Sequence, residues 1–549
     1  MCSMRKVCVQ KFIVLAAVCV FTACTSTGKG KSEMDLLNVP QETPEPVAVP
    51  ALMGPYVTYE EFGAAGDGAS DDFLAIINAH NHANANSLPV RAGDGAVYYI
   101  GHLHAAAVND SPSDTRAIIE TNTYWGNARF IIDNRNISSE TGRRSWIFQV
   151  RSTRDSINLM EEPYAITSVQ KNQARLPGIQ WEQGALVRAS NQDIRFQRRD
   201  FSGTSAMNDV FKIDKDGNID PYTPVIWNFD TLTSLTAHLV ENEPLFISGG
   251  HFETIANDAD YGFYHYRGIL INRSNTVIDG FTHTVTGDNP TGPSSMGMIY
   301  ISGVSDVTIQ NTVLTGRRVT RHGTYDLGIN SSTNITLINV TQSNDITDRD
   351  YWGIMGANDI KNIYLYKVRF SRYDTHRQTH NVTHNVTLKD SEFGHAGIQI
   401  TGSGLLWIEN TVSYHDDQFV CFRHDWGSTW DGNVYIINCT WYPNSDEVYL
   451  LHFNNNGQHQ FNITEGRNDY VCSMPAKFVL DGMTIMRGNV TVNLFSEIRD
   501  GFDPEAPFVL KLPQEVVVKR GVFGHNGQST AYNIPSFVRD NPGFTVTVK

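Results

Sequence analysis

Short runs of β-branched and other apolar residues, each followed by Asn, Asp or Gly, recur through the central part of the chain. The centres of one series are Ile278, Ile309, Leu337, Leu365, Leu388 and Ile408. Successive centres lie 31, 28, 28, 23 and 20 residues apart, and each run is too short to bury a hydrophobic face alone. A repeat of about 20 to 50 residues is typical of a solenoid, in which each repeat packs on its neighbours. The pattern therefore predicts stacked coils.

A second series of short runs lies between the members of the first. Each run alternates apolar residues with more variable ones, as a strand with one buried face does. The runs occupy residues 268–272, 297–302, 326–331, 352–357, 396–401, 419–424 and 448–453. We expect these strands to stack into one long sheet.

Residues 56–85 predict a turn followed by a helix. Ser70, Asp71 or Asp72 is suited to cap a helix that begins near Phe73. The stretch FGAAGDGASDD with its Ala-rich helix resembles the entry segment of the pectate-lyase-like superfamily of right-handed parallel β-helices. The resemblance implies an all-β solenoid with an N-terminal capping helix. It implies no single activity, because lyases, hydrolases, epimerases and phage tail-spikes share this segment.

The remaining chain fits one solenoid domain over residues 55–549. Residues 100–240 keep strand-like runs but contain longer excursions, and the segment from about residue 505 predicts edge strands that close the solenoid. The stretch FKIDKDGNIDPY (211–222) resembles the opening of a calcium loop. Ile219 stands where that loop needs Gly, and Val225 where it needs Glu, so a hairpin turn is the favoured interpretation.

The N-terminus predicts export from the cytoplasm. A short basic region precedes the apolar run IVLAAVCVFTAC, which is too short to span a bilayer. Its end resembles the lipobox of bacterial lipoproteins, which implies a signal peptide over residues 1–23 and lipid on Cys24; an ordinary cleaved signal is the alternative. The Pro-rich residues 24–54 then predict a flexible tether to the cell envelope, on its periplasmic or outer side.

Composition indicates a folded, acidic protein. The chain is 40% hydrophobic and 18% charged, and its formal net charge is −15. Loss of three positive charges with the signal would take this to −18, which disfavours nucleic acid as a partner. An acidic polysaccharide would need a local basic cleft.

Cysteine and asparagine patterns have structural explanations. Outside the N-terminal region only Cys421, Cys439 and Cys472 remain, and an odd number without short paired spacing predicts buried thiols rather than disulfides or a zinc site. Triplets such as Asn334-Ile-Thr and Asn385-Val-Thr are best explained as turn asparagines beside strands.

One region concentrates groups that can do acid–base chemistry. Six of the eighteen histidines lie between residues 376 and 424, and neighbouring coils are only about 4.8 Å apart, so a solenoid would bring them together. β-Elimination at a uronic acid needs a cation to neutralise the sugar carboxylate, a base for the C5 proton and an acid for the leaving oxygen.

We assign candidate roles on this basis. Arg377 and Arg423 are the candidate neutralising cations, and His376 and His380 the candidate bases. The candidate acids are Tyr373, His424 and His452.

Further residues on the same coils are candidates for binding a long polymer. Aromatic rings stack on sugar faces, and amides and imidazoles bind hydroxyl groups. These candidates are His395, Gln399, Trp426, Trp430 and His452.

Three alternatives compete with this interpretation. In the first, the histidines serve turns, with Arg372 and Asp374 forming an ordinary surface ion pair. Zinc is disfavoured, because His376 and His380 would lie about 13 Å apart on a strand. A hydrolase would use carboxylates, and Asp416-Asp417 with the stretch 394–397 is similar to motifs of polygalacturonases, although here the His motif precedes the Asp pair and the family's other motifs are missing.

The combined picture resembles the polysaccharide lyases of gut Bacteroidetes-type bacteria. The resemblance implies β-elimination on a uronic-acid glycan, with a glycosaminoglycan such as chondroitin sulfate or hyaluronan as the narrower expectation. A β-helix glycoside hydrolase and a non-catalytic glycan-binding solenoid stay open. We expect a monomer without a cofactor, and a calcium requirement is left open.

Overall fold

The computed structural model describes most of the chain from residue 43 onward. The described residues are 43–101, 116–137, 142, 144–198, 204–257, 264–289, 292–318, 324–353, 355–375, 383–423, 429–453, 459–460, 472–496 and 510–549. Residues 43–549 form one compact unit. No helix within the described ranges is long and apolar enough to cross a membrane.

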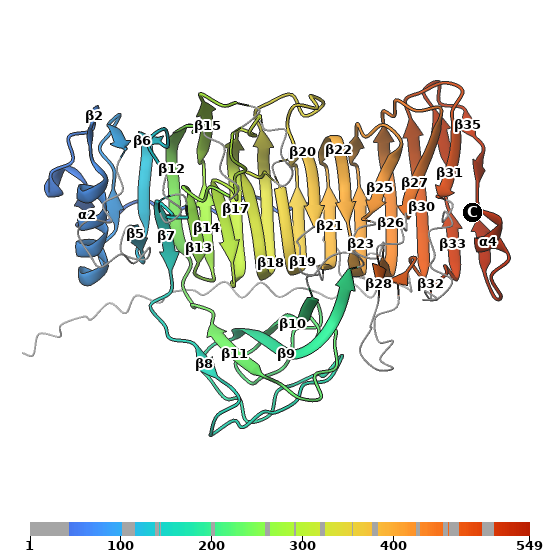
Figure 1. Ribbon diagram of the computed structural model, residues 1–549, viewed down its shortest axis with the longest axis horizontal. Coiled ribbons are helices and arrows are strands. Elements are labelled where there is room, and N and C mark those ends of the chain that lie inside the picture. Colours follow the sequence, from blue (N-terminus) through green and yellow to red (C-terminus); the bar gives the residue numbers. More distant parts are fainter. Residues whose placement is uncertain are drawn as a thin grey trace, which may run out of the picture. The chain divides into compact units, whose positions relative to one another are not determined.

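The compact unit is a parallel β-helix, as predicted. Strands from successive coils lie side by side along the long axis (Figure 1), and each coil contributes to three sheet faces. Face 1 carries the predicted second series of strands. It contains β5 (Ala117–Ile119), β7 (Phe148–Arg151), β13 (Ile269–Asn272), β16 (Ile299–Ser302), the starts of β18 (Leu327–Gln342) and β19 (Met355–Tyr366), the ends of β20 (Arg369–Thr375) and β22 (Glu392–Ile400), β25 (Gln418–Phe422), β27 (Glu447–Phe453), β31 (Thr491–Phe495) and β36 (Tyr532–Asn533).

Face 2 carries the predicted first series. It contains β1 (Val57–Thr58), β3 (Val90–Arg91), the starts of β6 (Thr123–Asp133) and β12 (Leu245–Ile255), β14 (Thr276–Asp279), β17 (Ser305–Leu314), the middles of β18 and β19, β21 (Thr383–Lys389), β23 (Gly402–Glu409), the starts of β26 (Trp430–Trp441) and β30 (Lys477–Ile485), β33 (Glu515–Val518) and β37 (Thr545–Val548).

Face 3 completes each coil. It contains β2 (Asp67–Asp71), β4 (Val97–Ile100), β15 (Thr282–Thr286), β24 (Val412–Ser413), β34 (Val522–Gly524) and the remaining parts of the long strands. The short strand β35 (Ser529–Thr530) pairs antiparallel with β34.

Alternation along the face 1 strands builds the core. Residues in register on successive strands form an inward column in which Ile299, Leu327, Met355 and Ile398 are almost fully buried. Equivalent columns on the other faces join this one in a continuous apolar core. Burial of apolar side chains stabilises the coil by about 25 cal/mol per Å² removed from water, so the stack gains stability with every added coil.

Asparagine ladders mark the corner between faces 2 and 3, as predicted for turn residues. Asn311, Asn339, Asn410 and Asn438 all have a positive φ, which Asn tolerates better than most residues. The Asn339 amide donates to Asn311 at 3.0 Å, and the Asn438 amide donates to Asn410 at 2.8 Å. Neighbouring coils are thereby linked outside the core.

The predicted capping helix covers the first coils. It is α2 (Phe73–Asn86), preceded by the short 3-10 helix η1 (Glu60–Phe62). Asp72 occupies the N-cap position, but its carboxylate accepts from the backbone N–H of Ala65, while Asp71 accepts from the N–H of Phe73 at 3.0 Å. At the other end, α4 (Ser536–Arg539) lies beside the last coils.

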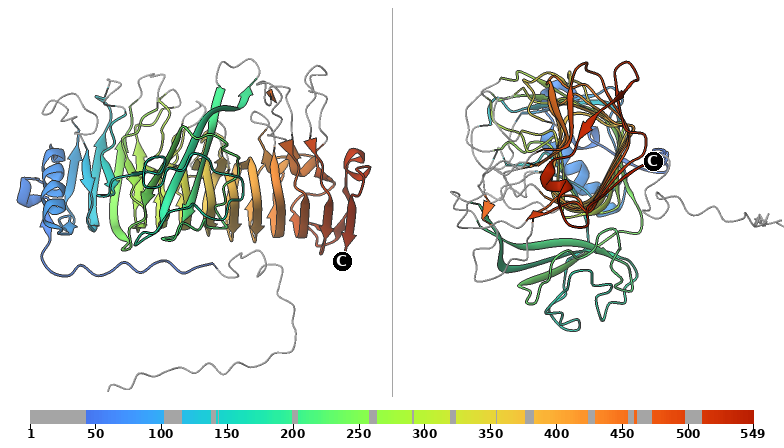
Figure 2. Two further views of the ribbon diagram at one scale, coloured as in Figure 1. Left: turned by 90° about the horizontal axis from the view of Figure 1, so that it is seen from below. Right: turned by 90° about the vertical axis from the view of Figure 1, so that its right-hand side faces the viewer.

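A small antiparallel sheet interrupts the solenoid between β7 and β12. It contains β8 (Ile157–Asn158), β9 (Ala185–Arg198), β10 (Thr204–Ile213) and β11 (Ser234–Leu239), with β28 (His459–Gln460) pairing to β9; β29 (Cys472–Ser473) and β32 (Leu510–Lys511) pair separately. This inserted sheet has its own apolar core and lies beside the coils (Figure 2). The chain at 213–219 is a turn, as predicted, closed by the Asp214 N–H donating to the Asn218 carbonyl.

Polar contacts dock the inserted sheet on the coils. Lys361 Nζ of β19 lies 2.5 Å from Asp209 Oδ1 of β10, and both side chains are buried. Lys212 forms a second ion pair with Asp306 at 2.8 Å. Burial lowers the pKa of Lys361, and the Asp209 charge opposes this shift. A buried charge without its partner is costly, so this pair fixes the docking geometry.

The last part of the expected tether lies on the solenoid. The Thr43 hydroxyl donates to Asp390 at 2.7 Å. The backbone of Val47 exchanges two hydrogen bonds with the Gln310 amide, at 2.8 and 2.7 Å. Residues 43–47 are therefore held along the coils.

Candidate active site

Face 1 presents an outward column that changes character along the axis. Register brings one outward residue from each coil into line. The outward column consists of Leu270, Tyr300, Gly328, Gly356, Asp374, Gln399, Cys421 and His452. It passes from apolar and small residues to mostly polar ones along the axis.

Two arginines and a tyrosine surround Asp374. Arg372 Nη2 lies 2.9 Å from one carboxylate oxygen and Arg423 Nη1 lies 3.0 Å from the other. The Tyr325 hydroxyl also donates to Asp374, at 3.1 Å. Arg372 donates further to Gln399 at 2.8 Å. Two guanidiniums share one carboxylate, so this group carries a net charge of +1.

Aromatic rings lie along the same face beside this network. The Arg372 guanidinium stands over the Trp352 ring, 4.8 Å from its centre. Tyr325 lies across Gly356, where an added Cβ would come within 2.8 Å of the ring. Tyr300 lies in the same way across Gly328. The glycines of the outward column therefore make room for rings that cover the sheet.

His395 stands at the corner that leads into face 1. Its Nε2 lies 2.8 Å from the Tyr351 carbonyl oxygen. A carbonyl only accepts, so Nε2 carries the proton and Nδ1 of the neutral ring keeps its lone pair. Burial lowers the pKa of His395; the bond to Tyr351 opposes this, and the charges of Arg349, His415 and Arg372 lower the pKa further. His395 is thus a neutral base among cations.

His415 and Asp417 occupy the next coil at the same corner. His415 Nδ1 lies 3.4 Å from Asp417 Oδ1, and the hydrogen bond with His415 lowers the pKa of Asp417 although burial opposes it. The His415 ring packs over Gly397, where an added Cβ would lie 3.0 Å from the ring. Asp416 pairs with Arg349.

Three predicted site residues meet on this surface. Gln399 and His452 belong to the outward column, and Arg423 projects two residues beyond Cys421 onto the same side. His395 lies at the adjoining corner. Five other candidates and the lipid-site cysteine lie outside the described residues: His376, Arg377, His380, His424, Trp426 and Cys24.

The predicted site roles of two residues are wrong. Tyr373 is fully buried and pairs with Met355 and Ile398 of the inward column. Tyr373 lies on β20 in register with the inward residues of the neighbouring coils, so it falls on an inward position. Trp430 is fully buried and its indole N–H donates to the Gly404 carbonyl. Neither side chain reaches a ligand on the surface.

The site also contains residues that the sequence did not point to. One alternative interpretation made Arg372 and Asp374 an ordinary surface ion pair, but their side chains are 3% and 0% exposed. Tyr325 was not a candidate, because its partner Asp374 is 49 residues away in the chain. The alternation that predicted Gln399 on the outer side of face 1 also places Asp374 there, because Asp374 on β20 is in register with Gln399 on β22.

A second buried polar cluster lies where the chain enters face 1. Asp326 and His283 are 3.9 Å apart and each is 2% exposed at its side chain. Burial raises the pKa of Asp326 to about 8 and lowers that of His283 to about 3. The adjoining cavity of about 20 Å³ has room for one water. Asp326 therefore does not reach a polymer on the surface.

Metal binding finds no ready site here. Within the described ranges no group of three or more His, Cys, Asp or Glu side chains is arranged to hold an ion. Cys421 and Cys439 are buried and lie outside any disulfide, as predicted for these two residues.

The chain was compared with protein-family models, curated proteins and solved structures. No protein-family model matches the sequence, and no curated protein matches it. A tailspike of Pseudomonas phage phi297 is 11% identical over 90% of this chain and 84% of its own, with a TM-score of 0.47. A surface adhesin of Streptococcus pneumoniae is 12% identical over 90% of this chain and 100% of its own, with a TM-score of 0.36. An exopolygalacturonase of Thermotoga maritima is 10% identical over 87% of this chain and 82% of its own, with a TM-score of 0.32. Likenesses this distant carry no information on what this chain binds or cleaves.

Proposed function

We propose that this protein is a carbohydrate-active β-helix that cleaves a uronic-acid-containing polysaccharide by β-elimination. The observation that carries the proposal is the neutral His395 imidazole standing beside the charges of Arg349 and Arg372. A glycosaminoglycan such as chondroitin sulfate or hyaluronan is the narrower candidate substrate.

The proposed reaction uses groups on one surface. The uronate carboxylate binds next to Arg423, where two guanidiniums and one carboxylate leave a net positive charge. His395 Nδ1 takes the C5 proton, the bond between C4 and the leaving oxygen breaks, and a C4–C5 double bond forms. His452 of the outward column gives a proton to the leaving oxygen.

A hydrolase is less well supported by the same residues. Hydrolysis needs one protonated and one ionised carboxyl group facing the bond. Asp374, Asp416 and Asp417 each pair with a cationic or imidazole side chain. The protonated candidate, Asp326, is 1% exposed.

The test is to supply a panel of uronate polysaccharides and follow two products. A lyase creates an unsaturated sugar that absorbs in the ultraviolet, whereas a hydrolase releases reducing ends without this absorbance. Repeating the assay with a chelator decides whether calcium is required. Absence of both products across the panel would leave only a glycan-binding role and so defeat the proposal.

The His395→Ala variant examines the proposed base. Loss of a general base typically lowers turnover about 10²- to 10⁴-fold. His384→Ala is the matched control, because His384 bonds Ser403 on β23 of face 2 and lies away from the outward column. An equal loss in both variants would mean a structural effect.

The proposal includes the location of the enzyme. We propose that it acts as a monomer, held at the cell envelope by lipid on Cys24. Cys24→Ser is then expected to move the protein from the membrane fraction to the soluble fraction, and unchanged membrane association would contradict the anchor.

A further inference from the structure

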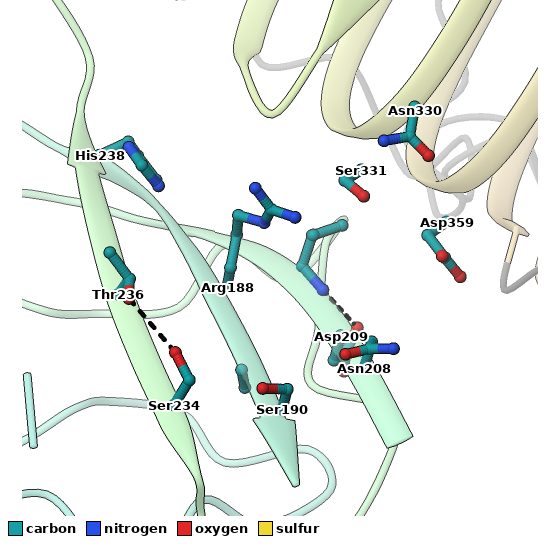
Figure 3. A pocket seen from close by; sticks show the side chains of 12 residues that line it. Arg188, Ser190, Asn208, Asp209, Ser234, Thr236, His238, Asn330, Ser331 and Asp359 are labelled. Carbon is teal, nitrogen blue, oxygen red and sulfur yellow. Dashed lines mark hydrogen bonds between the residues drawn. The ribbon is translucent and has the colours of Figure 1, made fainter. Parts of the chain in front are cut away.

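A polar cavity separates the inserted sheet from the coils. Its volume is about 360 Å³, within the range of small-ligand pockets. Arg188, Thr236 and His238 line it from β9 and β11, and Asn330 and Asp359 line it from β18 and β19 (Figure 3). The docking contact between Lys361 and Asp209 forms one edge of this arrangement.

The alternation of the inserted sheet explains why the cavity is polar. Val187 and Ala189 of β9 face the apolar core of the insert, and so do Leu235 and Ala237 of β11. The residues between them, such as Arg188, therefore face the solenoid. The hydroxyl groups of Ser190, Ser234 and Thr236 lie on the same cavity-facing side.

Arg188 is the arginine that lines this cavity, together with the carboxylates of Asp209 and Asp359. It is exposed, and within the described part of the chain it makes no hydrogen bond or ion pair. It reaches toward the coils, where a Cβ added to Gly303 would lie 3.5 Å from its Nη1. Burial and the Arg188 charge together lower the pKa of His238, so this imidazole is held neutral.

The cavity lies next to the outward column. Asn330 is two residues beyond Gly328 on β18, so its side chain is on the outward side of the same strand. A sugar chain lying on face 1 would therefore pass beside Asn330, which lines the cavity.

We propose that this cavity is a second saccharide site, which holds an anionic sugar unit with its carboxylate or sulfate on Arg188. The serine and threonine hydroxyls and the Asp359 carboxylate bind the sugar hydroxyls. A guanidinium pairs with such planar or tetrahedral oxyanions through two parallel hydrogen bonds. The proposal rests on the proposed function for its substrate class, but the binding itself needs no catalysis.

The test uses the whole protein and two monosaccharides that differ in one group. NMR titration at millimolar concentration compares glucuronate with glucose, and galactose 6-sulfate serves as the sulfate probe. We expect the two anionic sugars to bind at least ten times more tightly than glucose. Equal affinities for all three sugars, or no binding of any, would overturn the proposal.

Variants separate the cavity from the rest of the surface. Arg188→Gln is expected to weaken anionic sugar binding at least tenfold, and Arg188→Lys to restore part of it. Arg175→Gln is the matched control, because Arg175 lies on the same insert and donates to the Asp216 carbonyl instead. An unchanged affinity in Arg188→Gln would overturn the assignment of Arg188.

The two proposals fail separately. His395→Ala is expected to lose polysaccharide cleavage and keep glucuronate binding in the cavity. Cleavage by a protein that shows no Arg188-dependent binding would defeat the cavity site alone. Arg188-dependent binding without cleavage of any polymer would defeat the proposed reaction and leave a glycan-binding cavity.

Discussion

Asp374 and Asp326 are both buried carboxyl groups at face 1, and their surroundings are opposite. Asp374 is met by Arg372, Arg423 and the Tyr325 hydroxyl within 3.1 Å. Asp326 lies 3.9 Å from His283, and burial raises its pKa to about 8 although the charge of Arg317 opposes this shift. Burial alone therefore does not decide the protonation state of a carboxyl group. The cations brought to it by neighbouring coils decide it.

Asp374→Asn should cause the largest change. It leaves the Arg372 and Arg423 guanidiniums without their counter-charge, and breaking such a buried pair costs about 3–5 kcal/mol of unfolding free energy. Urea denaturation measures this. Asp326→Asn at pH 7 is the control and should not destabilise the protein, because burial of the Asp326 carboxyl group already costs stability at that pH. Similar losses in both variants would remove the distinction between the two sites.

The pH dependence of Asp326→Asn should be the next largest effect. The folded pKa of Asp326 is raised to about 8, above the unfolded value of about 3.9. Its contribution to stability is therefore fully present below about pH 4 and is lost as pH rises to about 8, by at most about 1.4 kcal/mol per pH unit. Against wild type, the variant should gain stability over this window. A difference independent of pH would contradict the raised pKa.

Tyr325→Phe should have a smaller effect on the Asp374 site. It removes one hydrogen bond to a charged group, which is worth about 1.5–3 kcal/mol, and leaves both arginines in place. Thermal unfolding measures the loss. Tyr442→Phe, on a ring that is 41% exposed, should change stability by no more than about 0.5 kcal/mol. If the two variants match, the Tyr325 hydroxyl does not support Asp374.

Arg349→Ala should have the smallest effect on stability. Its ion pair with Asp416 is exposed, with side chains 65% and 37% accessible, and such pairs contribute about 0–1 kcal/mol. Because the Arg349 charge lowers the pKa of His395, the acid limb of the pH–rate profile should move to higher pH. A profile that does not move would show that Arg349 is too distant or too screened to act on His395.

The fold could be read from the sequence because its signals are local and repeated. Alternating apolar runs at a period of 20 to 31 residues predicted the coils, and turn asparagines such as Asn334 do have a positive φ. Gln399, Arg423 and His452 were placed on one surface by the same alternation. Tyr373 was misplaced because β20 passes from face 3 to face 1 without the intervening loop of earlier coils, so Tyr373 falls in register with the inward residues Met355 and Ile398.

The inserted sheet was beyond this kind of prediction. Its strands between residues 157 and 239 were visible only as longer excursions, and nothing local links them to the coils. The docking pair joins Asp209 to Lys361, which are 152 positions apart in the chain. The cavity around Arg188 exists only because of that docking.

The sequence by itself determined that this chain forms a stacked β-solenoid with an apolar interior and a polar outer sheet, because side-chain alternation and turn chemistry act over a few residues. Only the tertiary structure decided which outward groups become buried, which cations meet Asp374, and why Asp326 keeps its proton. Those outcomes depend on desolvation and on charges contributed by distant coils, and both arise only when the coils pack together.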